Sequence, residues 1–149
     1  MRAVVQRVLE SSVEVDGENI GQIGKGLLVL LAVEKNDGQE DLQYIYDKVV
    51  NLRIFEDQDG KMNRSLKDIG AELLVVSQFT LYGDVRKGRR PSFSDSAGPD
   101  FAKKYYEAFI DLAKNDSIYT ETGEFGADMK LSILNDGPVT ILLDSNRVF

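Results

Sequence analysis

The amino-acid sequence predicts a single α+β domain built from two helices and about eight strands. The chain has 149 residues, which is the length of one domain. No internal repeat, low-complexity tract or linker rich in Pro, Gly or Ser divides it. Strand-like patterns at both ends of the chain surround two helix-like patterns and one further strand. We therefore expect one domain covering residues 1–149.

The first quarter of the chain has the pattern of a β meander. Arg2–Leu9 and Ser12–Val15 alternate apolar and polar residues, and Asp16-Gly17 supplies turn residues before the next run, Asn19–Ile23. The run Leu27–Val33 is apolar throughout, which is typical of a strand covered on both faces.

Two segments have the spacing of amphipathic helices. The first follows Asp37, a candidate N-cap with Glu40 three residues later. Its apolar stripe is Leu42, Ile45, Val49 and Leu52. The second follows Gly98-Pro99-Asp100, where proline suits the first turn. Its apolar stripe is Phe101, Tyr105, Ala108 and Leu112.

The remaining strands lie between and after the helices. A buried strand is expected at Glu72–Ser77, and later strands at Ile118–Thr122, Met129–Leu134 and Val139–Leu143. Asn135-Asp136-Gly137-Pro138 joins the last two and has the residues of a tight hairpin turn. The bond before Pro138 can also be cis, because an X-Pro bond pays only about 0.5–1 kcal/mol for that isomer.

Composition excludes several kinds of chemistry. The chain has no cysteine and no histidine, which removes Ser-His-Asp and Cys-His catalysis and histidine-ligated zinc. Its net charge of −7 argues against a surface that is basic throughout. The longest apolar run, Leu27–Val33, is far shorter than the roughly 18–20 residues that span a bilayer. We expect a soluble, cytoplasmic protein with no membrane association.

Two glycine-containing segments resemble ligand-binding loops. Asp57-Gln58-Asp59-Gly60 resembles part of a calcium loop, but placing Gly60 at the sixth position puts Phe55 first and Leu66 last, where oxygen donors are needed. A hairpin turn is the better interpretation, and we predict no metal site. The glycines of Gly21–Gly26 precede a strand rather than a helix, so a strand connection with glycines at positive φ is expected.

A basic cluster stands out against the acidic composition. Four cations occur within five residues: Arg86, Lys87, Arg89 and Arg90. They belong to the segment Tyr82–Ala97, which is longer than an ordinary connection. The cluster fits either contact with nucleic-acid phosphates or a solvated loop.

The four residues at the end of the strand Glu72–Ser77 also allow two interpretations. Ser77-Gln78-Phe79-Thr80 contains three side chains able to form hydrogen bonds. They form either a strand-end turn that satisfies its own backbone or a corner that binds an anion or a carbonyl group.

Two motifs taken together resemble the signatures of the D-aminoacyl-tRNA deacylases. They are Ser77-Gln78-Phe79-Thr80-Leu81 and Asn135-Asp136-Gly137-Pro138-Val139-Thr140, in the same order and at similar spacing. Met1–Val8, Arg89–Phe93 and Gly123–Met129 also look like this family. The resemblance implies mainly antiparallel sheets in a barrel-like core, and a homodimer with active sites at its interface. It also implies hydrolysis of the ester that joins a D-amino acid to tRNA, with L-aminoacyl-tRNA left intact.

The resemblance assigns roles to single residues. The Gly137-Pro138 bond is expected to be cis, with its carbonyl groups reaching into the partner's pocket as a chirality gate, and Arg7 is expected to fix the orientation of that motif. A gate close to Cα senses direction rather than side chain, so glycine, which has no handedness, should pass. The partners implied are tRNA carrying a D-amino acid or glycine.

The expected chemistry uses the backbone and the substrate. Ser77, Gln78, Phe79 and Thr80 form the catalytic group, with the main-chain N–H groups near Phe79 and Thr80 as an oxyanion hole. The family resemblance implies that the 2′-OH of the terminal adenosine assists attack by water, so we expect no cofactor. The residues expected to line the pocket are Ala102, Phe125 and Met129. Two alternatives remain open: a non-catalytic RNA-binding module that uses Arg86–Arg90, and a general small-ester hydrolase with Thr80 as nucleophile.

Overall fold

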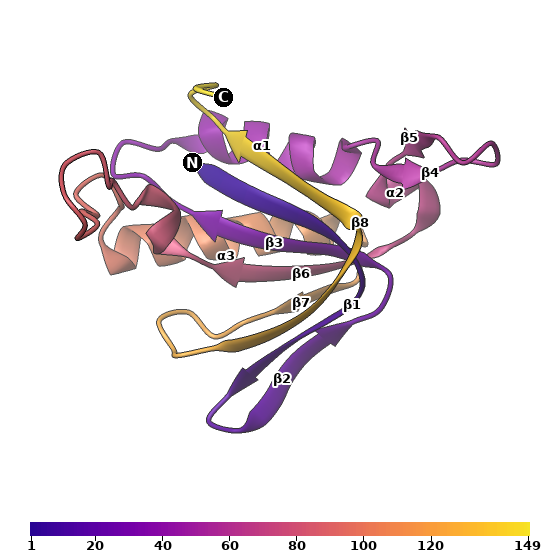
Figure 1. Cartoon of the computed structure of the whole chain (residues 1–149), viewed down its shortest axis with the longest axis horizontal. Helices are drawn as coiled ribbons and strands as arrows, with labels where there is room; N and C mark the ends of the chain where they lie inside the picture. Colours follow the sequence, from indigo (N-terminus) through magenta and orange to yellow (C-terminus); the bar gives the residue numbers. More distant parts are fainter.

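The computed structural model describes residues 1–149. A strongly curved six-stranded sheet has two long helices on one of its faces (Figure 1). The elements are β1 (Arg2–Val15), β2 (Glu18–Ile23), β3 (Gly26–Ala32), α1 (Gln39–Asn51), β4 (Phe55–Glu56), β5 (Met62–Arg64), α2 (Leu66–Ile69), β6 (Glu72–Ser77), the 3-10 turn η1 (Phe79–Tyr82), α3 (Pro99–Asn115), β7 (Thr120–Thr122) and β8 (Lys130–Asp144). The predicted α+β class and the two principal helices are confirmed.

Strand β1 organises the sheet. One of its edges pairs antiparallel with β8 along almost its whole length. Its other edge pairs first with β3 and then with β2. The register continues from Val8 opposite Gly26 to Ser11 opposite Ile23, and it shifts by one residue between Val13 and Glu14. The predicted meander is therefore wrong, because β2 and β3 lie end to end along β1. The turn at Asp16-Gly17 is confirmed, and both residues have positive φ.

The sheet nearly closes into a barrel. Strands β3, β6 and β7 pair in parallel. The chain passes through α1 between β3 and β6, and through α3 between β6 and β7. At the far edge β2 approaches β7, where a Cβ on Gly21 would lie 3.0 Å from the carbonyl oxygen of Thr122. The expectation of positive φ at the glycines of Gly21–Gly26 is wrong, because none of Gly21, Gly24 and Gly26 has a positive φ. Gly26 instead allows close packing, because a Cβ there would overlap the carbonyl oxygen of Glu72.

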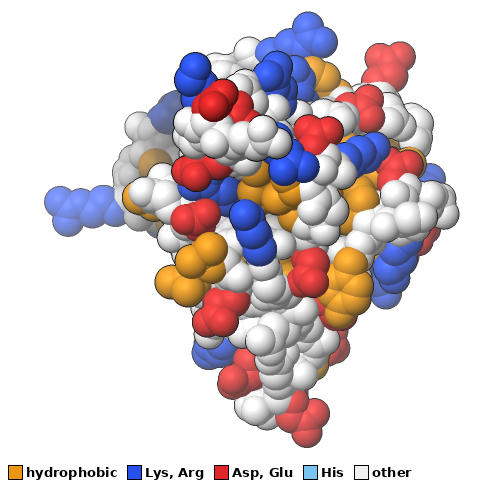
Figure 2. All heavy atoms as spheres, turned by 90° about the vertical axis from the view of Figure 1, so that its right-hand side faces the viewer, with side chains coloured by type: hydrophobic (Ala, Val, Ile, Leu, Met, Phe, Trp, Pro, Cys, Tyr) orange, Lys and Arg blue, Asp and Glu red, His pale blue; other side chains and the backbone are white.

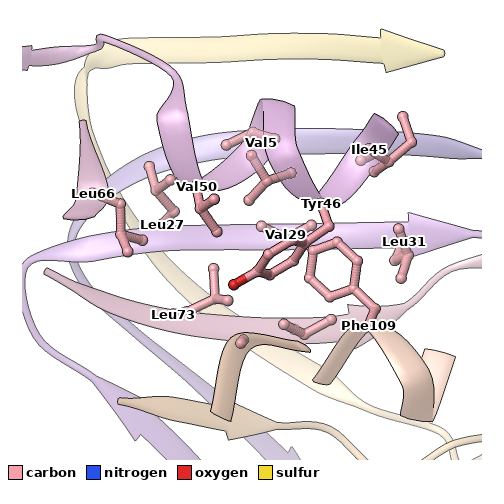
Figure 3. Packing of buried hydrophobic residues seen from close by; sticks show 14 of the residues in the cluster. Val5, Leu27, Val29, Leu31, Ile45, Tyr46, Val50, Leu66, Leu73 and Phe109 are labelled. Atoms are coloured by element: carbon pink, nitrogen blue, oxygen red, sulfur yellow. The ribbon is translucent and has the colours of Figure 1, made fainter. Parts of the chain in front are cut away.

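Strand β3 is buried on both faces, as predicted. Val29 faces α1 and α3 in the larger apolar cluster, whereas Leu28 belongs to a smaller cluster on the other face. Figure 3 shows the larger cluster, in which the ring of Tyr46 meets that of Phe109 edge to face with centroids 5.5 Å apart. These two residues join the helices to each other above the sheet.

Helix α1 begins one residue later than predicted. Gly38 is the N-cap, and its N–H donates to Oδ2 of Asp41 at 2.8 Å. Asp37 has another role: its carboxylate pairs with the buried N-terminal ammonium of Met1 and accepts the N–H of Glu34 at 2.7 Å. The predicted stripe is buried at Leu42, Ile45 and Val49, while Leu52 is the C-cap.

Helix α3 begins at Pro99 as predicted, but its buried face is rotated. The fully buried positions are Tyr106, Phe109, Ile110 and Ala113. The predicted stripe of Phe101, Tyr105, Ala108 and Leu112 flanks this face, and Phe101 is 38% exposed. Two stripes one residue apart both have helical spacing, and packing of the helix against the sheet decides which of them is buried.

The predicted hairpin at Asn135–Pro138 is wrong. Strand β8 continues through these residues, and the parts before and after them both pair with β1. Gln6 pairs with Thr140 and Val8 pairs with Asn135, so Asp136–Val139 form a bulge opposite Arg7. The side-chain amide of Asn135 donates to the carbonyl groups of Arg7 and Val139, each at 2.9 Å. The Gly137-Pro138 bond is cis.

Two smaller features complete the fold. Asp57–Gly60 forms a turn between β4 and β5, as expected, and Oδ1 of Asp57 accepts the N–H groups of Asp59 and Lys61. No helix is long and apolar enough to cross a membrane. On the face shown in Figure 2, acidic and basic side chains are interspersed and form no continuous basic surface.

Candidate active site

A largely apolar cavity of about 640 Å³ opens where β3 and β6 end. The start of α3 and the segment between β7 and β8 form its other walls. It brings together six of the predicted site residues: Ser77, Gln78, Phe79, Ala102, Phe125 and Met129. These residues come from three separate parts of the chain.

The end of β6 provides the polar wall of the cavity. The N–H of Gln78 donates to the carbonyl oxygen of Leu31 at 2.8 Å, which fixes the chain as it leaves the sheet. Phe79 and Thr80 begin η1, where the first amides have no acceptor within the turn. Their N–H groups can therefore donate hydrogen bonds to the oxygen of a ligand.

Thr80 itself does not line the cavity. Its hydroxyl oxygen is contacted by the side-chain amide of Gln78, and Asp128 is the one carboxylate among the lining residues. A threonine hydroxyl needs an adjacent base to act as a nucleophile, and an amide cannot accept its proton. Nowhere in the chain do three or more carboxylate groups gather in a way that could hold a metal ion.

The mouth of the cavity carries an aromatic pair that the sequence did not predict. Phe79 is 57% exposed, and its ring lies edge to face on that of Phe93 at 5.1 Å. Phe93 belongs to the loop after η1, which also supplies Ser96 and Ala97 to the cavity wall. In the sequence, Phe93 belongs to the segment Arg89–Phe93 that resembles the family, and the sequence predicts no role for it.

The basic cluster lies on this same loop. Asp84 and Ser92 pair across it, and all four cations between them are exposed. Nε and Nη2 of Arg86 donate to the carboxylate of Asp84 at 2.9 and 2.8 Å. These hydrogen bonds lower the pKa of Asp84 to about 2. The other three cations of this cluster, Lys87, Arg89 and Arg90, form no ion pair.

Arg7, Gly137 and Pro138 lie together but do not line this cavity. Nη1 of Arg7 donates to the carbonyl oxygen of Ile54 at 2.6 Å, and its Nε lies 3.1 Å from Oδ2 of Asp136. Gly137 has φ of +118°, and a Cβ there would lie 3.1 Å from Nη2 of Arg7. Only glycine fits this position, because both the backbone conformation and the space exclude a side chain.

Strand β8, which carries Gly137, has an open edge. It pairs with β1 and with no other strand. Large apolar side chains project from it into solvent: Ile133, Leu134 and Leu142. An exposed apolar edge strand of this length is unusual in a protein that acts as a monomer.

Comparison with known proteins decides the family. The model for D-Tyr-tRNA(Tyr) deacylase matches residues 4–144, nearly the whole chain. The chain belongs to this family. Two proteins named D-aminoacyl-tRNA deacylase, one from Thermosipho africanus and one from Clostridium botulinum, are each 62% identical to this chain over 149 residues. Each match covers both chains completely. The resemblance seen in the two sequence motifs is thereby confirmed.

Two solved structures share the fold of this family member. One, titled c-Myc DNA Unwinding Element Binding Protein, has a TM-score of 0.91 and 42% identity, covering 97% of this chain and 98% of that one. The other, titled as a probable eukaryotic D-amino acid tRNA deacylase, has a TM-score of 0.80 at 19% identity, covering 95% and 97%. The second likeness concerns the fold alone.

Proposed function

We propose that this protein hydrolyses the ester between a D-amino acid and the 3′ end of tRNA, releasing the free amino acid and tRNA. The observation that carries the proposal is full-length identity of 62% to deacylases named for this substrate. The cavity at the end of β6 fits the role, because an apolar site with a few polar groups at one wall suits an aminoacyl ester.

The reaction is proposed to run on main-chain groups. Water attacks the ester carbonyl carbon, the C–O bond to the ribose 3′ oxygen breaks, and that oxygen leaves with a proton. The N–H groups of Phe79 and Thr80 hold the developing oxyanion, and Ser77 and Gln78 complete this wall. The chain has no histidine or cysteine to activate the water, so the neighbouring 2′-OH of the substrate assists it.

The chirality gate is proposed to come from a second copy of the chain. Gly137 and Pro138 do not line the cavity of their own chain, and they lie on β8, the strand with the open apolar edge. A homodimer formed along this edge would bring their carbonyl groups toward the partner's cavity. Since such a gate reads only the direction of substituents at Cα, glycyl-tRNA should also be a substrate.

The tRNA is proposed to contact the loop beside the cavity. Lys87, Arg89 and Arg90 are exposed there, and Lys103 and Lys104 lie on the first turns of α3. Few phosphate contacts are involved, so binding should depend weakly on salt. This basic loop is also the observation that favours the second candidate, a non-catalytic RNA-binding module.

The deciding experiment compares matched substrates. The protein is mixed with D-tyrosyl-tRNA and L-tyrosyl-tRNA in separate reactions, and release of the free amino acid is followed. The proposal requires rapid release from the D form only. Equal rates on the two forms would contradict the proposal. Lasting binding without release from either form would favour the RNA-binding module. Loss of release from tRNA ending in 2′-deoxyadenosine would identify the assisting group.

A further inference from the structure

Tyr106 is itself one of the residues that line the cavity. It is buried on α3, and its hydroxyl donates to the carbonyl oxygen of Val75 at 2.9 Å. The same hydroxyl lies 3.5 Å from the carbonyl oxygen of Gly123. Burial raises the pKa of the phenol, so the group stays protonated and remains a donor at neutral pH. One side chain thus joins α3, β6 and the chain leaving β7.

Gly123 occupies the same junction. Its N–H donates to the carbonyl oxygen of Val75 at 3.1 Å, so this oxygen accepts from both Gly123 and Tyr106. A Cβ on Gly123 would lie 2.6 Å from the sulfur of Met129. Because no atom is there, Met129 packs directly against the backbone. Two residues further on, the ring of Phe125 lies 5.7 Å from that of Tyr106.

We infer that Tyr106 and Gly123 are positioning residues that set the substrate wall formed by Phe125 and Met129. The inference rests on the proposed function, which makes this wall the surface against which the aminoacyl end of the tRNA lies. The Tyr106 hydroxyl is buried against the backbone, so it acts through the wall. A wall that holds the ground state and the transition state alike affects KM and leaves kcat nearly unchanged.

The test uses a matched pair of tyrosine variants. Tyr106→Phe keeps the ring and removes the hydroxyl. Tyr46→Phe is the control, because Tyr46 is equally buried and its hydroxyl donates to the carbonyl oxygen of Leu112 at 3.2 Å and to Asp116, away from the cavity. Steady-state hydrolysis of D-tyrosyl-tRNA and the melting temperature are measured for both. We expect Tyr106→Phe to raise KM about fivefold with kcat within about twofold of wild type.

The control separates positioning from stability. Tyr46→Phe should lower the melting temperature at least as much as Tyr106→Phe and leave KM unchanged. An equal KM in the two variants, or a fall in kcat at unchanged KM for Tyr106→Phe, would overturn the inference. If the wild-type protein itself releases no D-tyrosine, the proposed function fails instead.

A second variant, at Gly123, disturbs the same wall through Met129. Gly123→Ala forces the sulfur of Met129 to move, since the new methyl group would lie 2.6 Å from it. It should also raise KM, and its effect combined with Tyr106→Phe should be less than additive because both disturb one wall. An unchanged KM in Gly123→Ala would contradict the inference even if Tyr106→Phe failed to fold.

Discussion

Nε of Arg7 lies 3.1 Å from Oδ2 of Asp136, across the bulge between β1 and β8. The geometry is that of an ion pair and not of a directed hydrogen bond, since Nε has no hydrogen-bond partner. Only 7% of the Arg7 side chain is exposed, so its charge depends on Asp136 and on the carbonyl oxygen of Ile54. Asp136 directly precedes Gly137, and the pair therefore ties the Gly-Pro motif to the body of the sheet.

Asp136→Asn should destabilise the protein. The change keeps the shape of the side chain and leaves the guanidinium of Arg7 buried without its anionic partner. We expect the free energy of unfolding to fall by about 1–3 kcal/mol. Equilibrium urea denaturation measures the difference.

Glu107→Gln provides the comparison, because it also removes one carboxylate from an ion pair. Lys103 and Glu107 lie 3.8 Å apart on the exposed face of α3, with both side chains more than half exposed. This variant should change the stability by no more than about 0.5 kcal/mol. If Asp136→Asn proved as mild as Glu107→Gln, the ion pair with Arg7 would not stabilise the bulge.

Thr80→Ala should retain a substantial part of the deacylase activity. In the proposed reaction the main-chain N–H of residue 80 contributes, and alanine keeps that group. We expect single-turnover release of D-tyrosine within about tenfold of wild type. A loss of about a thousandfold or more, together with an acyl group trapped on the protein, would instead identify Thr80 as the nucleophile of a general ester hydrolase.

Much of the fold could be predicted from local pattern. The apolar run Leu27–Val33 predicts a strand buried on both faces, and Pro99 marks the start of α3. The segment Asn135–Pro138 could not be predicted in the same way. Its residues favour a turn, yet the strands on either side pair with β1 and not with each other. Such pairing depends on contacts between distant parts of the chain, which local propensity does not contain.

The candidate site also contains residues that local pattern predicts and residues that it does not. Ser77–Phe79, Phe125 and Met129 meet in one cavity. Tyr106 was missed because the helix has two apolar stripes one residue apart, and only packing against the sheet decides between them. The proposed action of Gly137 and Pro138 on a partner's cavity also cannot be predicted from local pattern.

Asp84→Asn should strengthen tRNA binding. Arg86 donates two side-chain hydrogen bonds to Asp84, so a guanidinium of the basic cluster is held by the protein itself. The variant frees Arg86 for a phosphate contact, and we expect the dissociation constant to fall about threefold at low salt. Asp59→Asn, at an exposed turn between β4 and β5, changes the net charge equally and should have a smaller effect. Equal effects would mean that net charge alone is responsible.

The titration of Asp84 reports directly on what Arg86 contacts. The hydrogen bonds from Arg86 lower the pKa of this carboxyl to about 2, below its ordinary 3.8. A lowered pKa in the folded state means that the pair stabilises the protein above about pH 4 and loses this effect as the pH falls toward 2. Arg86→Gln should return the pKa toward about 4, as measured by NMR of the carboxyl carbon.

The same resonance distinguishes two ways of binding tRNA. If Arg86 leaves Asp84 for a phosphate, the pKa of Asp84 should rise in the complex, because its principal donor has been withdrawn. If Lys87, Arg89 and Arg90 make the contacts alone, the pKa of Asp84 should stay near its value in the free protein. Titrating the protein with a non-hydrolysable aminoacyl-tRNA mimic decides between them. We expect the rise, since phosphate is the stronger competitor for a guanidinium that is 83% exposed, and an unchanged pKa would assign Arg86 to the loop itself.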